Sequence, residues 1–289
     1  MHARPTLLAV ASIALGNCLH ASVAAPVFTV NSPSDAAGDA NPGDGICETA
    51  PGSGVCTLRA ALQESYITGA VINLPAYTIT LQSQIFVGAA PTSLVGFGPG
   101  LSVISLQSVA MDGSARIFNL ASGATLHLTG IRFTGGMSTG AASTGGAILG
   151  TAAAITITNC RFDANRAAIG GGAIYLADAN AAVTMTGSTF DGNSSGFSDG
   201  GAIYLTGSAA ALSITNSTFI TNHAGYSGGA IRFYGPSATI ADSVFTANQA
   251  GYMDLHFADA GHDGGALWVQ TSLDVSGSTF TGNSGGLGG

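Results

Sequence analysis

Two short motifs alternate along the second half of the chain, and their spacing constrains the fold more than any other feature. Gly-Gly-Ala-Ile begins at residues 145, 171, 200 and 228, and it returns as Gly-Gly-Ala-Leu at residue 264. Phe-x-x-Asn interleaves with it at Phe162/Asn165, Phe190/Asn193, Phe219/Asn222, Phe245/Asn248 and Phe280/Asn283, while Phe133 with Gly136 fits the same phase. Repeats of this kind indicate stacked units that bury their faces only against one another.

Each repeat contains two runs with the period-two alternation of a β-strand. In Ile174-Tyr175-Leu176 and its equivalents, we expect the outer residues to point inward and the middle residue outward. A second run follows, as in Val183-Thr184-Met185. After this run, a corner is predicted where the repeats place Asn, Asp or Gly, because these residues tolerate left-handed backbone angles. The corner positions are Asn159, Gly187, Asn216, Asp242 and Gly277.

Short strands separated by corners, with like residues in register, predict a coil whose successive turns pair as parallel strands about 4.8 Å apart. A β-propeller needs longer, four-stranded repeats, and a leucine-rich solenoid needs regular Leu and a helix in each repeat. The repeated Phe should form a central stack, and the Asn from Asn165 to Asn283 a ladder that satisfies backbone groups at the corners. The predicted fold is therefore all-β, a single-stranded parallel β-helix (solenoid).

The composition suits this fold and excludes some partners. The chain has 289 residues, of which 46% are hydrophobic and only 8% charged, with 43 Gly and no Lys. Such a composition is typical of short strands and tight turns. The formal net charge of −8 and the scattered Arg exclude nucleic acid as a partner and exclude a polybasic membrane segment.

The first residues resemble a Sec-type secretory signal. Arg4 precedes a short apolar run from residue 7 to 15, and Ser22-Val23-Ala24 offers a small-residue cleavage site. We expect cleavage after Ala24 and a protein that is extracellular or on the outer cell surface. No later stretch reaches the roughly 18 apolar residues of a membrane-spanning helix. The alternative is a lipoprotein anchored through an acylated Cys18. Asn17 disfavours it, because a small residue is expected directly before such a Cys.

Export changes the interpretation of the cysteines. An oxidising compartment favours a disulfide between Cys47 and Cys56, whereas a metal site would need further Cys or His nearby. Cys160 stands where other repeats carry Ser, so we expect it to be a small packing residue.

The ends of a solenoid expose core and strand edges, so a cap is required. Residues 57–65 predict a capping helix, with Thr57 as N-cap and with Leu58 and Leu62 on one face. The expected organisation is a signal peptide over 1–24, an N-terminal cap over 25–70 and the β-helix over 71–289. Because the last residues stop where another Gly-Gly-Ala-Ile would begin, we expect the natural protein to continue.

Two parts of the chain resemble known families. Cys47, Cys56-Thr57-Leu58-Arg59-Ala60-Ala61 and the stretch to Gly100 resemble the CSLREA-domain proteins of bacterial surfaces, although Thr57 and Ala60 replace the Ser and Glu of that motif. The repeats from 133 to 283 resemble the chlamydial type of polymorphic outer-membrane protein repeat. This second resemblance implies a right-handed β-helix of the pectin-lyase-like class, used in adhesion and surface display.

One outward column is the main candidate for binding. If the coils are in register, Tyr175, Tyr204, Arg232 and Trp268 lie above one another on one face. Aromatic faces bind sugars or proteins, and Arg232 can add cation–π contacts. We therefore expect a glycan or a protein on another surface as the partner. Mutual packing of these side chains on a lateral surface is the alternative interpretation.

Asp163 and Asp191 are the candidates under an enzymatic alternative. Both follow the repeat Phe, so they should lie on adjacent coils about one strand spacing apart. Such a pair suits a retaining glycoside hydrolase or a Ca²⁺ site, and pectin-lyase-like polysaccharide lyases also build sites on the coil flank. The competing interpretation is a solvated turn, with Arg161 and Arg166 neutralising the pair. The sequence favours a binding protein over an enzyme.

Two further segments carry polar residues without a diagnostic spacing. An insertion between Asn248 and Gly264 contains Tyr252, Asp254, His256, Asp259, His262 and Asp263, which suits partner contact, a metal or an idle loop. The acidic stretch Asp35, Asp39, Asn41 and Asp44 misses the calcium-binding EF-hand spacing by one residue. Ca²⁺ is therefore the one cofactor considered, and no other is expected.

Overall fold

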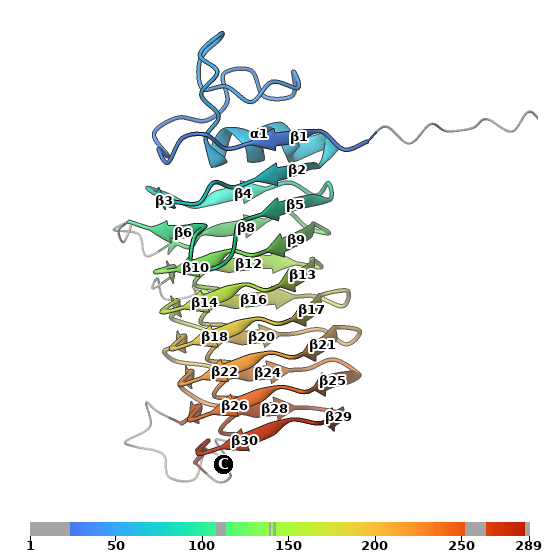
Figure 1. Cartoon of the computed structure of the whole chain (residues 1–289). Helices are drawn as coiled ribbons and strands as arrows, with labels where there is room; N and C mark the ends of the chain where they lie inside the picture. The colour runs from blue at the N-terminus through green and yellow to red at the C-terminus, as the bar shows by residue number, and fades with distance from the viewer. Residues whose placement is uncertain (1–23, 108–113, 139, 141–142, 252–263, 287–289) are drawn as a thin grey trace, which may run out of the picture.

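The computed structural model describes residues 24–107, 114–138, 140, 143–251 and 264–286. The strands stack along one axis, from the helix α1 at one end to β30 at the other, as the predicted parallel β-helix requires (Figure 1). The predicted signal peptide and the insertion at residues 252–263 lie outside the described residues, apart from Ala24. Within the described residues, no helix is long and apolar enough to cross a membrane.

Four sheets run along the axis. The nine-stranded sheet contains β1 (Val27–Thr29), β2 (Ala70–Asn73), β5 (Thr92–Val95), β9 (Thr125–Thr129), β13 (Ala154–Thr158), β17 (Ala182–Thr186), β21 (Ala211–Thr215), β25 (Ser237–Ala241) and β29 (Ser272–Ser276). The eight-stranded sheet contains β3 (Thr78–Leu81), β6 (Val103–Leu106), β10 (Arg132–Thr134), β14 (Arg161–Asp163), β18 (Thr189–Asp191), β22 (Thr218–Ile220), β26 (Val244–Thr246) and β30 (Thr279–Thr281).

The two other sheets complete the cross-section of each coil. The seven-stranded sheet contains β4 (Ile85–Val87), β8 (Phe118–Leu120), β12 (Ile148–Thr151), β16 (Ile174–Ala177), β20 (Ile203–Leu205), β24 (Ile231–Phe233) and β28 (Leu267–Val269). The six-stranded sheet contains β7 (Ser114–Ala115), β11 (Met137–Ser138), β15 (Arg166–Ala167), β19 (Ser194–Ser195), β23 (His223–Ala224) and β27 (Gln249–Ala250). Among the described strands, β7 and β11 alone pair antiparallel.

The corners follow the sequence prediction. Asn159, Asn216 and Asp242 have φ of 50°, 48° and 50°, and Gly187 and Gly277 have φ of 61° and 57°. These are left-handed values, which explains why the repeats choose Asn, Asp or Gly here. Each corner turns the chain from the nine-stranded into the eight-stranded sheet.

The repeated Phe form a stack through the core. Strand register pairs Phe162 with Phe190 and Phe190 with Phe219. From Phe133 to Phe280, successive ring centroids lie 4.7 to 5.1 Å apart in stacked orientation. Isolated aromatic pairs prefer offset or edge-to-face geometry. The strand spacing therefore sets this arrangement, and the stack confirms that the coils are in register.

A ladder of buried Asn runs beside this stack. Asn193 Oδ1 accepts hydrogen bonds from the backbone N–H and the side-chain amide of Asn165, at 3.1 and 3.0 Å. Its Nδ2 donates to the Phe162 carbonyl and to Asn222 Oδ1, both at 3.0 Å. Asn165, Asn193, Asn222 and Asn248 are fully buried. The ladder thus satisfies corner backbone groups that water cannot reach.

The cap covers the N-terminal end of the stack. Helix α1 (Leu58–Thr68) starts at Thr57, whose hydroxyl accepts a hydrogen bond from Ala60 N at 3.1 Å. Leu58 and Leu62 are buried on the face that meets the coils, as predicted. Arg59 donates to both carboxylate oxygens of Asp35, at 2.8 and 2.7 Å. This ion pair and the apolar face hold the helix across the open end.

The predicted disulfide joins Cys47 to Cys56 and closes the loop that precedes α1. Cys160 is free and buried, and burial raises the pKa of its thiol to about 11, so it packs as a neutral side chain.

The disulfide should stabilise the cap by restricting the unfolded loop. Substituting Cys47→Ser and Cys56→Ser together should lower the free energy of local opening at α1 by about 2–3 kcal/mol. Native-state hydrogen exchange of the α1 amides measures this change. Dithiothreitol should reproduce the loss in the natural sequence and have no effect on the double variant. Equal exchange in oxidised and reduced protein would contradict the prediction.

Candidate binding face

The predicted outward column lies on the seven-stranded sheet. Strand register places Tyr175 beside Tyr204, Tyr204 beside Arg232, and Arg232 beside Trp268. Each of these residues is half-buried, between inward neighbours that form the core. The four positions come together as the repeat alignment requires.

The structure adds Tyr234, which sequence reasoning missed. Its ring centroid lies 6.0 Å from that of Tyr204 and 5.1 Å from that of Trp268, so it closes the gap that Arg232 leaves between the rings. Tyr175 meets Tyr204 edge-to-face at 5.3 Å. Tyr234 follows the inward Phe233 directly, so alternation alone could have assigned it an outward position. We call Tyr175, Tyr204, Arg232, Tyr234 and Trp268 the aromatic face.

Arg232 is tied into the aromatic face by several contacts. Its guanidinium carbon lies 4.2 Å from the centroid of Trp268 and 4.9 Å from that of Tyr234. Its two terminal nitrogens donate to the Asp199 carboxylate and to the Tyr234 hydroxyl. Asp199 also accepts the backbone N–H of Ser227 at 3.0 Å. These contacts fix the side chain between the rings and neutralise its charge.

Burial raises the pKa of the Tyr204 hydroxyl, and the negative charge of Asp199 raises it further. Tyr204 is therefore a neutral hydrogen-bonding group at any physiological pH. With Arg232 and Asp199 paired, the aromatic face presents rings and hydroxyl groups but no net charge.

Asp163 and Asp191 are register partners on adjacent strands, as the repeat alignment predicted. Arg132 binds both carboxylate oxygens of Asp163, at 2.7 and 2.6 Å. Arg161 bridges the two residues, at 3.2 Å from Asp163 and 2.8 Å from Asp191. Arg161 therefore neutralises the pair, as the competing interpretation expects, but its second partner in this role is Arg132 and not Arg166.

This pairing determines the protonation state of Asp163. Burial acts to raise the pKa of its carboxyl group, but the hydrogen bond and charge of Arg132, with Thr134 and Arg161, lower it overall. Asp163 is therefore ionised at neutral pH, whereas a general acid must carry a proton. The carboxylates and guanidinium groups form an alternating chain along the coils.

The acidic residues of the cap fall into two groups with different partners. Asp35 binds Arg59, and it also accepts the backbone N–H of Gln82 at 2.7 Å. Asp39, Asp44 and Glu64 have carboxylate oxygens within 4.8 Å of one another. Asp39 and Asp44 accept N–H groups of their own loop, and Glu64 accepts those of Gly43 and Gly45 at 2.7 and 2.9 Å. The carboxylates therefore already serve to hold the loop.

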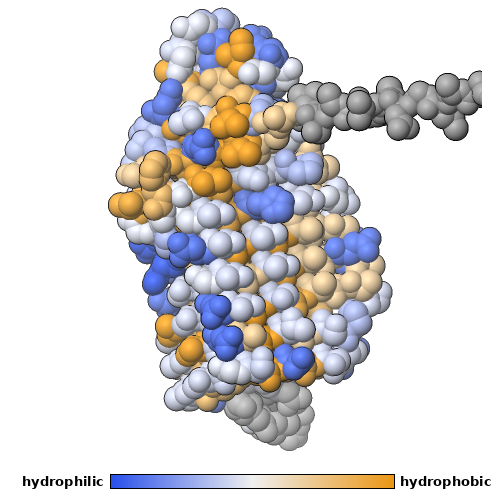
Figure 2. All heavy atoms as spheres, turned by 45° about the vertical axis from the view of Figure 1, so that its right-hand side comes forward, coloured by the Kyte–Doolittle hydropathy of each residue, from blue (hydrophilic) through white to orange (hydrophobic). Residues whose placement is uncertain are grey.

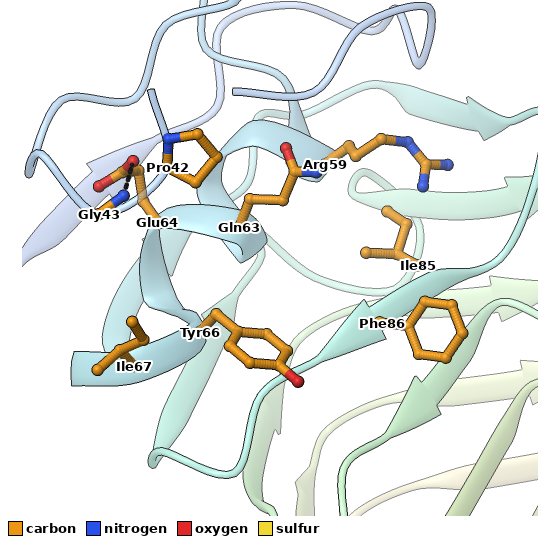
Figure 3. Close-up of a pocket in the computed structure, with 9 residues that line it drawn as sticks. All are labelled: Pro42, Gly43, Arg59, Gln63, Glu64, Tyr66, Ile67, Ile85 and Phe86. Atoms are coloured by element: carbon orange, nitrogen blue, oxygen red, sulfur yellow. Dashed lines mark hydrogen bonds between the residues drawn. The ribbon is translucent and has the colours of Figure 1, made fainter. Parts of the chain in front are cut away.

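A hollow beside α1 was not predicted. Figure 3 shows Tyr66 and Ile67 of the helix at one side of it and Phe86 of β4 at the other, and these three side chains are exposed. Its volume is about 340 Å³. Figure 2 shows hydrophobic side chains concentrated toward the cap, and rows of side chains of intermediate hydropathy across the coils.

The comparisons with known proteins agree with the architecture. A family model described as a right-handed β-helix region matches residues 108–219 and 148–288, which together span more than half of the chain. The chain therefore belongs to the right-handed β-helix family. The right-handed winding that the resemblance of its repeats implies is confirmed. Neither the curated proteins nor the solved structures include a match.

Proposed function

We propose that this protein is a secreted or cell-surface β-helix with an adhesin or display role, and that the aromatic face is its binding surface for a glycan or a protein on another surface. The observation that carries this proposal is the unbroken series of ring contacts from Tyr175 to Trp268. Trp268 is the only Trp of the chain, and it lies in this series. Rings that combine apolar area with polar groups are typical of binding surfaces.

Two sequence features support an extracellular role. The signal-like start, with cleavage proposed after Ala24, would direct the chain out of the cytoplasm. The resemblances to CSLREA-domain proteins and to polymorphic outer-membrane protein repeats favour a bacterial surface. The disulfide between Cys47 and Cys56 is compatible with an oxidising compartment.

The enzymatic alternative, a polysaccharide lyase or glycoside hydrolase, has less support. Asp163 and Asp191 both bind Arg161, and Asp163 also binds Arg132. A hydrolase of the retaining type needs one protonated and one free carboxyl group. The lowered pKa of Asp163 argues against a protonated carboxyl group there, and because both Asp163 and Asp191 are paired with Arg side chains, neither is a free carboxylate.

Removing two rings of the aromatic face should weaken binding strongly. We expect the Tyr204→Ala and Trp268→Ala double variant to bind cells or extracellular matrix at least roughly tenfold more weakly than the natural sequence. Surface plasmon resonance or flow cytometry with the purified chain measures this. Tyr66→Ala with Phe97→Ala is the matched control, because it removes two exposed rings elsewhere. Equal binding by both double variants would refute the aromatic face as the binding surface.

A further inference from the structure

We propose that the ligand of the aromatic face is a neutral polysaccharide chain, lying along the helix axis with its sugar rings on Tyr204, Tyr234 and Trp268. This inference rests on the proposed function, because it names the ligand class of the same face. Three observations support it: a groove beside the rings that carries hydrogen-bonding side chains, the absence of a charged side chain among the described residues of its lining, and the spacing of the rings.

The groove runs beside Tyr204 and Tyr234 and has a volume of about 380 Å³. Its remaining lining residues are Thr206, Gly207 and Ser208 of the β20–β21 loop, and Gln270 at the end of β28. The hydroxyl groups of Thr206 and Ser208 and the amide of Gln270 both donate and accept hydrogen bonds. Sugar hydroxyls need partners of this type.

The loop that forms this groove is held close to the preceding coil. Gly207 has φ of 156°, and a Cβ at this position would lie 2.1 Å from the Asp178 carbonyl oxygen. Only Gly permits this approach. The groove is therefore a fixed part of the coil surface and requires little reorganisation to accept a ligand.

The charges of the site select against an acidic glycan. The described residues that line the groove carry no charged side chain. Arg232 is already bound to Asp199 and stacked on two rings. A carboxylated or sulfated sugar would need an uncommitted cation, and the chain has a formal net charge of −8. A neutral sugar carries no charge, so it needs no such cation.

The ring spacing fits a chain of sugars. The centroids of Tyr204, Tyr234 and Trp268 follow one another at 6.0 and 5.1 Å. This step is about the length of one hexose unit in an extended polysaccharide. The three rings are tilted by 37° and 48° to one another, and Arg232 covers part of Tyr234 and Trp268. The C–H groups of a sugar ring carry partial positive charge, and aromatic faces are negative, so each sugar can pack on the part of one ring that stays exposed. Successive sugars can therefore occupy successive coils.

A glycan array and the intrinsic fluorescence of Trp268 together test this inference. The full chain is applied to an array that carries neutral hexasaccharides (cellohexaose, mannohexaose, xylohexaose) and acidic ones such as hexagalacturonate. Binders are then titrated while emission of the sole Trp is followed. We expect at least one neutral hexasaccharide to shift the emission, more tightly than its disaccharide. Hexagalacturonate should leave the emission unchanged.

Variants assign the contacts. Tyr234→Ala and Gln270→Ala should each weaken binding of the neutral hexasaccharide about tenfold. Tyr234→Phe, which keeps the ring, should retain most of the affinity. Tyr66→Ala, at an exposed ring of α1, is the control and should change nothing. Unchanged circular dichroism in each variant shows that the fold is intact.

The outcomes separate this inference from the proposed function. Preferred binding of hexagalacturonate would overturn the neutral ligand but retain the face. Failure of every saccharide, with cell binding still lost in the Tyr204→Ala and Trp268→Ala variant, would overturn the glycan in favour of a protein partner. Unchanged cell binding in that variant would overturn both proposals. Neutral binding that survives Tyr234→Ala and Gln270→Ala would refute the groove.

Discussion

Replacing Phe190 with Ala is expected to lower the free energy of unfolding by about 3–5 kcal/mol. Phe190 is fully buried and stacks on Phe162 at 4.7 Å and on Phe219 at 5.1 Å. The stack is fixed by strand pairing, so neighbouring rings cannot collapse into the space that the substitution leaves. The loss should appear as a lower urea midpoint, followed by circular dichroism.

Phe197 provides the matched control, because its side chain is 64% exposed on the neighbouring loop. Phe197→Ala should shift the urea midpoint only slightly, since little buried surface is lost. If Phe190→Ala and Phe197→Ala gave equal midpoints, the central stack would contribute no more than a surface ring.

Substituting Asn193→Ala should cost about 2–4 kcal/mol, because it leaves buried polar groups without partners. The Asn165 backbone N–H and side-chain amide both donate to Asn193 Oδ1, and the Phe162 carbonyl accepts from Asn193 Nδ2. Water cannot replace these bonds readily, because the site is fully buried. Urea unfolding measures the loss.

Hydrogen exchange gives an independent test of the same substitution. The amide of Asn165 should exchange faster in Asn193→Ala than in the natural sequence, because its acceptor is gone. Asn180→Ala is the control, since Asn180 is exposed in the loop before β17. Matching stability of the two variants would show that the ladder is not needed to satisfy the corners.

The repeats were sufficient to predict the coil, because the core, the ladder and one set of corners each recur with the same residue types. The left-handed corners between the nine-stranded and eight-stranded sheets carry Asn, Asp or Gly, as at Asn159 and Gly187. The left-handed residues that follow the eight-stranded sheet include Ala164, Thr221 and Ala247, so residue type did not mark those corners. The central stack carries Phe in every repeat, and the Asn ladder carries Asn. The capping helix was predicted on different grounds, since Thr57 supplies an N-cap and Leu58 and Leu62 an apolar face. Its predicted end at residue 65 was three residues short.

The site was less predictable because its contacts join residues that repetition does not relate. Tyr234 stands where other coils have Thr206 and Gln270, so no repeated pattern marks it. The pairing of Arg132 with Asp163 crosses from one coil to the next, and Arg166 is closer in sequence but lies on another sheet. Such contacts become visible only when the register is known.

The Asn ladder has a consequence for how such a protein can change length. From Asn165 to Asn283, each rung uses the same three hydrogen bonds: the later Asn Oδ1 accepts from the backbone N–H and the side-chain amide of the earlier Asn, and the later Nδ2 donates to the Phe carbonyl of the earlier coil. A duplicated coil would therefore bring the Asn and the Phe carbonyl needed to bond to both neighbouring coils. If a whole coil were removed, the two coils on either side could form the same hydrogen bonds with each other. Loss of one corner residue would instead disturb the bonds of its own coil to the two coils beside it. Growth and shortening by whole modules are thus the changes this architecture tolerates.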